Sequence, residues 1–409
     1  MRQRALLAAV FSMLLLAAAC GGEPSAPEPA PTASTSPTAA TPEPVFFDPP
    51  TRFRASGQPL AAAPRRGGEL GELQVAAVLV DQAVVYVDGA ALAGLNVVDG
   101  EEEWVTNMPG VSSTDTSVVA TPVLFEGRVY AATAITIPGS TRVTSHRAVS
   151  LAAFDPKTGA VIWTATIDAL PGDPVQDVRL VGVTLDSIVV DTSTTTYVVD
   201  AQTRRTRWKV QYFEPTVVDG TVVVGQLGEE ATETKTRTAG FRLTDGVQLW
   251  KSDTSLQQGR SFPLGPGLMA AQGREFTSTD PYFEFLDTGS GQSRYPGKPA
   301  DLQALERCWF DARTTVVCSS TATPPAVVGY NASDLQEIWE LPVGDRGAPV
   351  VTSAWHGVVY GRLSGKPITL DGRTGAVRNA TAGAAPAVVN EYAGVSADSG
   401  SLTLFLAIG

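Results

Sequence analysis

The sequence is poor in the residues that most often carry catalysis or bind metals. Only two histidines and three cysteines occur among its 409 residues, and no HExxH, GxSxG or Walker-type motif is present. Basic residues are outnumbered, since 30 lysines and arginines stand against 42 aspartates and glutamates, which gives a net charge of −12 at pH 7. This acidity argues against nucleic acid as a partner, because phosphates call for a basic surface.

The N-terminal apolar stretch is too short to span a bilayer comfortably. It runs over 12 residues, from Ala5 to Leu16, and follows Arg2 and Arg4. Three alanines then precede Cys20, a pattern that looks like a bacterial lipobox, in which the cysteine thiol is diacylated and becomes the new N-terminus. We therefore expect residues 1–19 to be a lipoprotein signal peptide; an ordinary secretory signal with a nearby cysteine is the alternative.

A segment rich in proline, alanine, threonine and serine follows over residues 20–45. It cannot bury enough surface to offset its chain entropy, so we predict a disordered tether. A lipid at Cys20 and a tether together predict that a domain of residues 46–409 is held at the outer face of the cytoplasmic membrane. Arginine outnumbers lysine, and with the Cys-Gly-Gly start and the tether this favours an actinobacterial source.

The two remaining cysteines, Cys308 and Cys318, lie about equally far from a predicted turn at Asp311–Arg313. The flanking residues are typical of strands, so the pair is placed across a hairpin. In an exported protein this arrangement favours a cross-strand disulfide. Two buried free thiols are the alternative.

The rest of the chain repeats one motif, mostly at steps of 40 to 45 residues. An apolar strand ends in an aspartate or asparagine, a turn that often contains glycine follows, and an aromatic residue comes up to eight residues later. The stretch SLAAFDPKTGAVIWTATI, residues 150–167, is the best-preserved copy. We interpret the repeated residues as structural, with the tryptophan covering the seam to the next unit; they are Asp99, Trp104, Asp155, Gly159, Trp163, Asp200, Trp208, Asp245, Trp250, Asp287, Asn331, Trp339, Asp371 and Gly375.

Each copy is predicted to hold about four short antiparallel strands, which describes a blade of an all-β propeller. Seven motif copies are present, but residues 385–409 repeat the start of residues 348–371 and stop before a fourth strand. We therefore expect eight blades, the last one closed by an N-terminal strand at Thr51–Ala55. Seven blades are the alternative.

The pattern of apolar run, aspartate, Thr-Gly turn and tryptophan resembles the PQQ-like, quinoprotein-type β-propeller repeat, and the resemblance covers residues 46–409. It implies the fold and raises the possibility of a dehydrogenase that uses PQQ and calcium. Such enzymes often carry a disulfide between adjacent cysteines, and no Cys-Cys pair is present. No ligand position can be carried over, so we expect no cofactor, no metal and no catalysis.

Two copies carry long insertions between their second strand and the motif aspartate. The distance is 27 positions from Arg128 to Asp155 and 24 from Thr221 to Asp245, against 12 to 16 in the other copies. Loops carry function more often than the scaffold does, although a tolerated polar insertion is the alternative. The candidate recognition residues in these loops are Arg142, His146, Arg147, Glu229, Glu230, Lys235 and Arg237.

These observations favour a non-catalytic envelope lipoprotein whose propeller is a protein-binding or scaffolding platform. We expect a monomer that binds an envelope protein or a cell-wall component. The alternative is a PQQ- and calcium-dependent dehydrogenase, or a sensor of a small sugar or cell-wall ligand, that uses the central funnel of the propeller.

Overall fold

The folded unit of the protein, Pro44–Gly409, consists of strands and turns. The computed structural model describes residues 45–60, 65–67, 72–112, 119–141, 144–175, 177–228, 235–278, 280–295, 305–320, 324–398 and 401–409. Within these ranges no helix is long and apolar enough to cross a membrane.

Four antiparallel strands form each of the first four blades, which follow one another along the chain. Blade 1 comprises β4 (Ala77–Val80), β5 (Ala83–Asp88), β6 (Ala91–Asn96) and β7 (Glu102–Asn107). Blade 2 comprises β8 (Val123–Phe125), β9 (Arg128–Ile137), β10 (His146–Phe154) and β11 (Val161–Asp168). Blade 3 comprises β12 (Arg179–Val183), β13 (Ser187–Asp191), β14 (Thr195–Asp200) and β15 (Thr206–Gln211). Blade 4 comprises β16 (Phe213–Asp219), β17 (Val222–Gly228), β18 (Thr236–Arg242) and β19 (Gln248–Lys251).

The second half continues in the same order. Blade 5 comprises β20 (Leu256–Pro263), β21 (Leu268–Glu275) and β22 (Pro281–Asp287), with Ser293 bridged to β22 where an outer strand would lie. Blade 6 comprises β23 (Arg307–Phe310), β24 (Thr315–Ser320), β25 (Ala326–Asn331) and β26 (Glu337–Leu341). Blade 7 comprises β27 (Val350–Trp355), β28 (Val358–Leu363), β29 (Lys366–Asp371) and β30 (Val377–Asn379). Blade 8 comprises β31 (Val388–Val389), β32 (Ala393–Asp398), β33 (Ser401–Leu406) and, from the other end of the chain, β1 (Gln58–Pro59).

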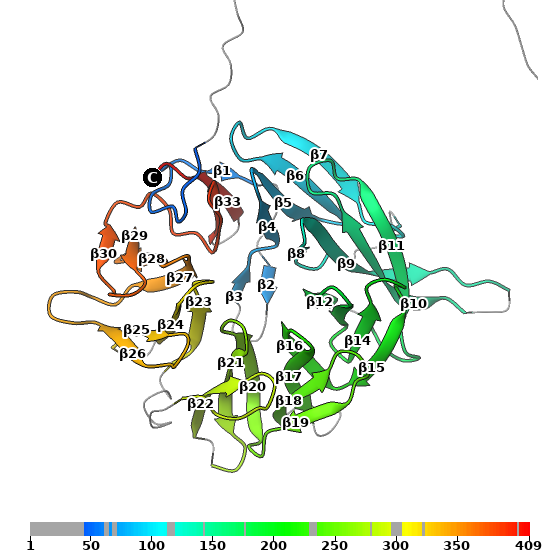
Figure 1. Ribbon diagram of the computed structural model, residues 1–409. Coiled ribbons are helices and arrows are strands. Elements are labelled where there is room, and N and C mark those ends of the chain that lie inside the picture. The colour runs from blue at the N-terminus through cyan, green and yellow to red at the C-terminus, as the bar shows by residue number, and fades with distance from the viewer. Residues whose placement is uncertain are drawn as a thin grey trace, which may run out of the picture. The chain divides into compact units, whose positions relative to one another are not determined.

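The eight blades stand around a common centre, with the first strand of each blade innermost (Figure 1). A short hairpin of β2 (Arg65–Gly67) and β3 (Glu72–Gln74) connects β1 to blade 1 and lies within the circle of inner strands in that view. Strands rich in valine, isoleucine and alanine pack face to face between neighbouring blades, and middle strands such as β5 and β13 are almost completely buried. The predicted all-β propeller is confirmed.

The N-terminal segment closes the ring through blade 8. The backbone N–H of Arg54 donates to the carbonyl oxygen of Leu406, and that of Ile408 donates to Arg52, before β1 pairs with β33. Phe53 lies between these bonds and is almost fully buried. The predicted closing strand is therefore present, and it extends beyond Thr51–Ala55 to Pro59. Because both ends of the chain share one sheet, the described ring has no open gap between its first and last blades.

The repeated residues lie at the seams between blades. The indole Nε1 of Trp339 in blade 6 donates to the carbonyl oxygen of Gly372 in blade 7, at 2.7 Å. The indoles of Trp104, Trp208 and Trp250 make the same kind of bond to the next blade. Trp163 lies instead under the guanidinium of Arg204, whose Cζ is 5.0 Å from the ring centroid. Each of these bonds joins the outer strand of one blade to the turn of the next.

The aspartates of the repeat hold those turns in shape. Oδ1 of Asp155 accepts hydrogen bonds from the backbone N–H groups of Lys157 and Thr158, and equivalent bonds form at the other copies. Bonds from the turn backbone lower the pKa of Asp155, Asp200 and Asp245, and that of Asp200 falls to about 2. A carboxylate that accepts hydrogen bonds from its own turn in this way has a structural role.

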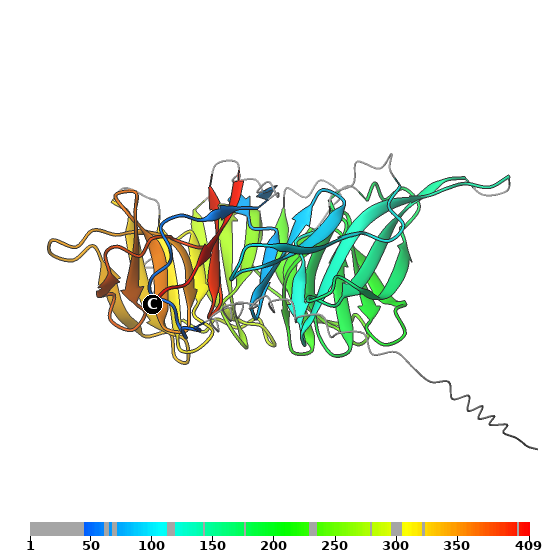
Figure 2. The same ribbon diagram turned by 90° about the horizontal axis from the view of Figure 1, so that it is seen from above.

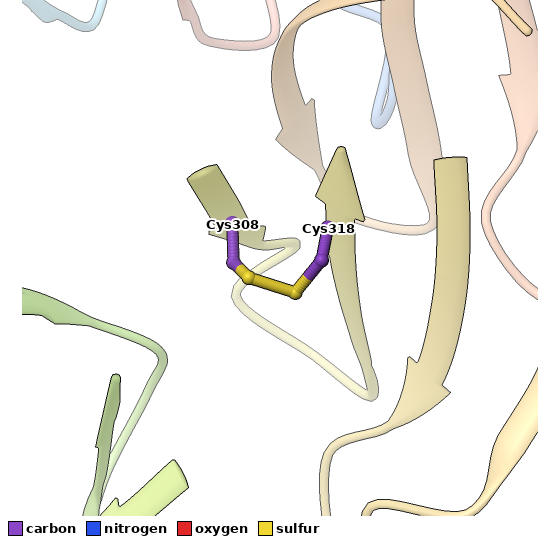
Figure 3. The surroundings of a disulfide bond; sticks show 2 residues. All are labelled: Cys308 and Cys318. Atoms are coloured by element: carbon purple, nitrogen blue, oxygen red, sulfur yellow. A yellow bond between two sulfur atoms is a disulfide. The ribbon is translucent and has the colours of Figure 1, made fainter. Parts of the chain in front are cut away.

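Cys308 and Cys318 face each other across β23 and β24 and form a disulfide (Figure 3). Both residues are buried in the core between blades 5 and 6. The predicted cross-hairpin bridge is confirmed. It fixes the inner strand of blade 6 to its neighbour, where the chain enters this blade from residues 296–304, which lie outside the described part.

Candidate protein-binding face

Successive connections in an antiparallel blade lie at opposite ends of its strands. We call the end with the connections between second and third strands the loop face. The end with the connections between third and fourth strands, where the repeat aspartates lie, is the turn face. Both long insertions found in the sequence, in blades 2 and 4, are connections between second and third strands. They therefore lie on the same face, on either side of blade 3.

The blade 2 hairpin, formed by β9, β10 and residues 138–145 between them, is the longest projection of the described chain. β9 has 10 residues and β10 has 9, whereas the corresponding strands of blade 3 have five and six. Pairing continues without a break to His146 opposite Ile137. The hairpin extends outward beyond the rim of the ring in both views (Figures 1 and 2). The paired strands are buried up to Ile135 and from Ala148, and the described residues 138–141 and 144–145 beyond them are exposed.

His146 and Arg147 lie at the loop end of the paired strands, directly next to residues 138–145. Nε2 of His146 is 3.3 Å from a carboxylate oxygen of Asp168 at the end of β11. The guanidinium of Arg147 donates to Oγ1 of Thr136 and to the carbonyl oxygen of Val175, at 2.9 and 3.2 Å. Arg147 thus fixes the hairpin to the connection that leads into blade 3, which leaves the residues beyond it to meet a partner.

The insertion of blade 4 is only partly described. Arg237 lies in β18 opposite Leu227, and Nζ of Lys235 is 5.5 Å from the ring centroid of Phe276 in blade 5. This cation–π contact joins the loops of two neighbouring blades on the loop face. The other candidate residues, Arg142, Glu229 and Glu230, lie outside the described residues.

A charged network in blade 3 was not found from the sequence. Nε and Nη2 of Arg179 on the inner strand β12 donate to Oδ2 of Asp191, at 3.0 and 2.6 Å. Nη1 of the same guanidinium donates to Glu214, the second residue of the inner strand of blade 4, at 3.0 Å. The three residues stand at the loop-face ends of their strands. Arg179 therefore binds blade 3 to blade 4 between the two insertions.

Asp191 is the buried member of this network, with a side chain only 1% exposed. Burial raises the pKa of its carboxyl group, and the guanidinium of Arg179 opposes that rise. Thr196 adds a hydrogen bond to Oδ1. Because the buried carboxylate is paired and hydrogen-bonded, its cost is offset and the loop-face end of blade 3 is rigid.

A second polar group reinforces the same end of blade 3. Oδ2 of Asp173 accepts hydrogen bonds from the hydroxyl groups of Thr192 and Tyr197, at 2.9 and 3.1 Å. The Tyr197 hydroxyl also accepts a bond from the backbone N–H of Leu170. Burial raises the pKa of Tyr197 to about 12, so the phenol stays protonated and donates. The connection between blades 2 and 3 is thereby held down on blade 3.

The turn face receives the N-terminal segment. The carboxylate of Asp48 binds Nη2 of Arg313 at 2.6 Å and Nδ1 of His356, both in turns between first and second strands. Partial burial opposes ionisation, but the hydrogen bond and charge of His356 and the charge of Arg313 lower the pKa of Asp48. The tyrosine hydroxyl of Tyr360 donates to the carbonyl oxygen of Pro50. His356 is thus part of an anchoring contact for the N-terminal segment.

The resemblance to quinoproteins raises the question of which acidic residues could hold PQQ with calcium. Within the described ranges no group of three or more histidine, cysteine, aspartate or glutamate side chains is placed to hold a metal ion. Asp191 and Glu214, acidic residues at the loop-face ends of blades 3 and 4, are both bound to Arg179. These two carboxylates therefore hold blades 3 and 4 together through Arg179.

The ring of antiparallel blades, most of them four-stranded and with a repeat tryptophan at five of the seams, defines the class: a β-propeller of PQQ-like repeats. The profile of a family described as outer membrane protein assembly factor BamB matches residues 68–184 and 147–281, together just over half of the chain. The chain therefore belongs to this family of PQQ-like repeat propellers. No curated protein matches the sequence.

Of three similar solved structures, one has a TM-score above 0.5 and supports the fold. BamB from Moraxella catarrhalis is 16% identical, over 89% of this chain and 99% of that one, with a TM-score of 0.41. Quinohemoprotein alcohol dehydrogenase ADHIIG from Pseudomonas putida HK5 is 11% identical, over 81% and 73%, with a TM-score of 0.45. The C-terminal WD40 domain of Sif2 is 10% identical, over 87% and 100%, with a TM-score of 0.51. Identities this low speak to the fold alone.

Proposed function

We propose that this protein is a non-catalytic, extracytoplasmic propeller that binds an envelope protein through its loop face, over blades 2 to 4. The observation that carries the proposal is the blade 2 hairpin, whose strands of 10 and 9 residues continue past the rest of the ring. A tolerated insertion needs no regular pairing, whereas a docking arm needs a fixed shape. The pairing of His146 with Ile137 gives the arm that shape.

The hydrogen-bonded network of blades 3 and 4 that lies between the two insertions also favours this surface as the binding site. Arg179, Asp191 and Glu214 join blades 3 and 4 at their loop-face ends, and Asp173 ties the entry of blade 3 to Tyr197. A partner that touches the insertions therefore meets a preorganised surface, which lowers the ordering cost of binding. The family's description as an assembly factor fits such a platform.

The location of the protein is the second part of the proposal. The Cys308–Cys318 disulfide is typical of proteins outside the reducing cytoplasm. We propose that Cys20 is diacylated and that residues 20–45 tether the propeller to the outer face of the cytoplasmic membrane. The first described residues support this attachment, since Phe47 bonds to Glu391 on the turn face, away from the proposed binding surface.

Site-specific photocrosslinking in the native envelope tests the binding face. A photoreactive residue at Ser140 in the blade 2 hairpin is expected to capture a discrete partner. The same group at Leu185, an exposed residue in the turn between β12 and β13 on the turn face, is the matched control and is expected not to capture it. Replacing residues 138–145 with Asn-Gly should remove the captured species. Identical products from both positions, or products unchanged by the replacement, would contradict the proposal.

A separate experiment tests the proposed lipid anchor at Cys20. Cys20→Ala is expected to release the protein from the membrane fraction and to remove the mass of the acyl groups from the mature chain. Continued sedimentation of the variant with membranes in high salt would count against lipidation at Cys20. This result is independent of the photocrosslinking experiment.

A further inference from the structure

The outer strand of blade 2 differs from the outer strands of the other blades in length. β11 has eight residues, against six in β7 and β15, five in β26, four in β19 and three in β30. The outer strand of a blade has no neighbour on one side, so half of its backbone N–H and C=O groups face outward. β11 therefore presents the longest open edge among the outer strands that the structure describes.

Most of β11 lacks the features that normally protect such an edge, since its one charged residue, Asp168, lies at the end of the strand. Its residues from Val161 to Ile167 include no charged residue and no proline. Every other described outer strand carries one or the other, as does the segment at Ser293 in blade 5; the protecting residues are Glu102, Glu103, Arg207, Lys209, Lys251, Arg294, Glu337, Glu340, Arg378 and Pro59. Charges and proline discourage pairing with a further strand. β11 differs from the other outer strands in its seven consecutive residues, Val161 to Ile167, that carry neither a charge nor proline.

The side chains of β11 are suited to a neighbouring strand. Val161 and Ile162 are 40% and 44% exposed, and Thr164 and Thr166 are exposed on the same edge strand. β-branched side chains such as these stabilise cross-strand pairs. The other face of the strand is already covered, since Trp163 and Ile167 pack in the core with blade 3. An added strand would thus extend the sheet without disturbing the seam.

We propose that a second copy of this chain covers the edge, by antiparallel pairing of β11 with β11 about a two-fold axis at Thr164. In this register Trp163 lies opposite the small Ala165, Ile162 opposite Thr166, and Val161 opposite Ile167. The charges are complementary as well, because Lys157 precedes the strand and Asp168 ends it. A two-fold axis brings the basic end of one strand toward the acidic end of the other. This dimer is our alternative to the monomer expected from the sequence.

Cysteine crosslinking of the full-length protein in native membranes tests the pairing. Thr164→Cys places two thiols opposite each other across the axis, so mild oxidation should give a disulfide-linked species of twice the protomer mass. Thr166→Cys is the matched control, because residue 166 lies opposite residue 162 of the second copy. Its yield should be roughly fivefold lower, since disulfides need Cα atoms within about 7 Å.

A charged residue on the edge provides a second measurement. In sedimentation of the purified full-length protein, the wild type should be dimeric and Thr164→Lys monomeric. At protein concentrations low enough for both to be monomeric, the two should unfold at the same temperature, because residue 164 is exposed. Equal crosslinking at residues 164 and 166, or a wild type that sediments as a monomer, would overturn the proposal. So would capture by Thr164→Cys of a protein of different mass, because the edge would then belong to another partner.

Discussion

The side-chain amide of Gln58 donates a hydrogen bond to the carbonyl oxygen of Gly100, 2.7 Å away, and so joins the last blade to the first. In blades 1, 3, 4 and 6 the same kind of seam is made by a tryptophan of the outer strand. Blade 8 takes its outer strand from the N-terminus, where no tryptophan is available. At this seam the side-chain amide N–H of Gln58 takes the place of the indole N–H, and its bond to Gly100 helps to close the ring.

The bond from Gln58 predicts a measurable cost when it is removed. Gln58→Ala should lower the free energy of unfolding by about 0.5–1.5 kcal/mol, the usual net value of one hydrogen bond. Gln202→Ala in an exposed turn of blade 3 is the control. Gln202 forms its hydrogen bond through its backbone N–H and makes none to the described residues of another blade through its side chain, so this change should alter stability by less than about 0.5 kcal/mol. Urea denaturation of both variants checks this. Equal effects would mean that the seam at blade 8 does not contribute to stability.

The turn glycine of blade 7 provides a test of the tryptophan seam. Gly375 has φ +63°, and a Cβ added there would lie 2.8 Å from the ring of Trp339. Gly344 has a similar φ of +56° with open space around it, so it isolates the backbone strain. Alanine at Gly344 should cost about 1 kcal/mol, and alanine at Gly375 about 1–3 kcal/mol more. If thermal unfolding shows the same loss of stability for both variants, residue 375 is not in close contact with Trp339 at the seam.

Acid sensitivity should follow from the turn aspartates. The pKa of Asp200 falls to about 2 in the folded protein because the turn backbone at Thr203 and the guanidinium of Arg207 bind its carboxylate. A lowered pKa contributes stability that is present above the unfolded value near 3.8 and is lost as the pH falls toward 2. Asp200→Asn should therefore be less stable at pH 7, and its difference from wild type should shrink between pH 4 and pH 2. Parallel curves over that range would contradict this assignment.

The fold could be predicted from the sequence because its signal is repeated. Asp155, the following glycine and Trp163 recur at near-constant spacing, and regular spacing is what packing between identical units requires. The closing strand could also be predicted from the sequence, because the last repeat stops one strand short. The extension of that strand to Pro59 was not, because only the register with β33 shows where pairing ends.

The candidate site was harder to predict, for a physical reason. Insertions in blades 2 and 4 were visible as spacing, but the network of Arg179, Asp191 and Glu214 joins residues up to 35 positions apart that belong to no repeated pattern. Such pairs form only when two blades pack. His146 and Arg147 were expected at the recognition surface; the structure places them at the loop end of the paired strands, and their role in recognition stays a prediction.

The disulfide should stabilise the entry to blade 6. Cys308 and Cys318 are 10 residues apart, and closing a loop of that size in the unfolded chain is worth about 2–3 kcal/mol. The double variant Cys308→Ala/Cys318→Ala should lose about that much in urea denaturation. Reduction of the wild type with dithiothreitol should give a similar loss, whereas the double variant should not respond. A response of the double variant would point to another effect of the reductant.

The pairing of Arg179 with the buried Asp191 yields the sharpest prediction for the loop face. Arg179→Met removes the cation and leaves an unpaired carboxylate that is only 1% exposed, which should cost about 3–5 kcal/mol. Burial already raises the pKa of Asp191, and without the guanidinium opposing it the pKa rises further. A raised carboxyl pKa makes the folded state less stable as the pH rises above the unfolded value. The variant should therefore gain stability, relative to wild type, as the pH is lowered from 7 toward 5.

A double variant separates the charge from the packing in this prediction. Arg179→Met combined with Asp191→Leu removes both charges, so most of the lost stability should return and the pH dependence between 5 and 7 should disappear. Because Glu214 keeps its exposed position, its remaining charge is solvated and should not reproduce the effect. If the single and double variants are equally unstable, the pair acts through shape and not through charge. Recovery in the double variant would show that Asp191 is tolerated in blade 3 only because Arg179 reaches it from the inner strand.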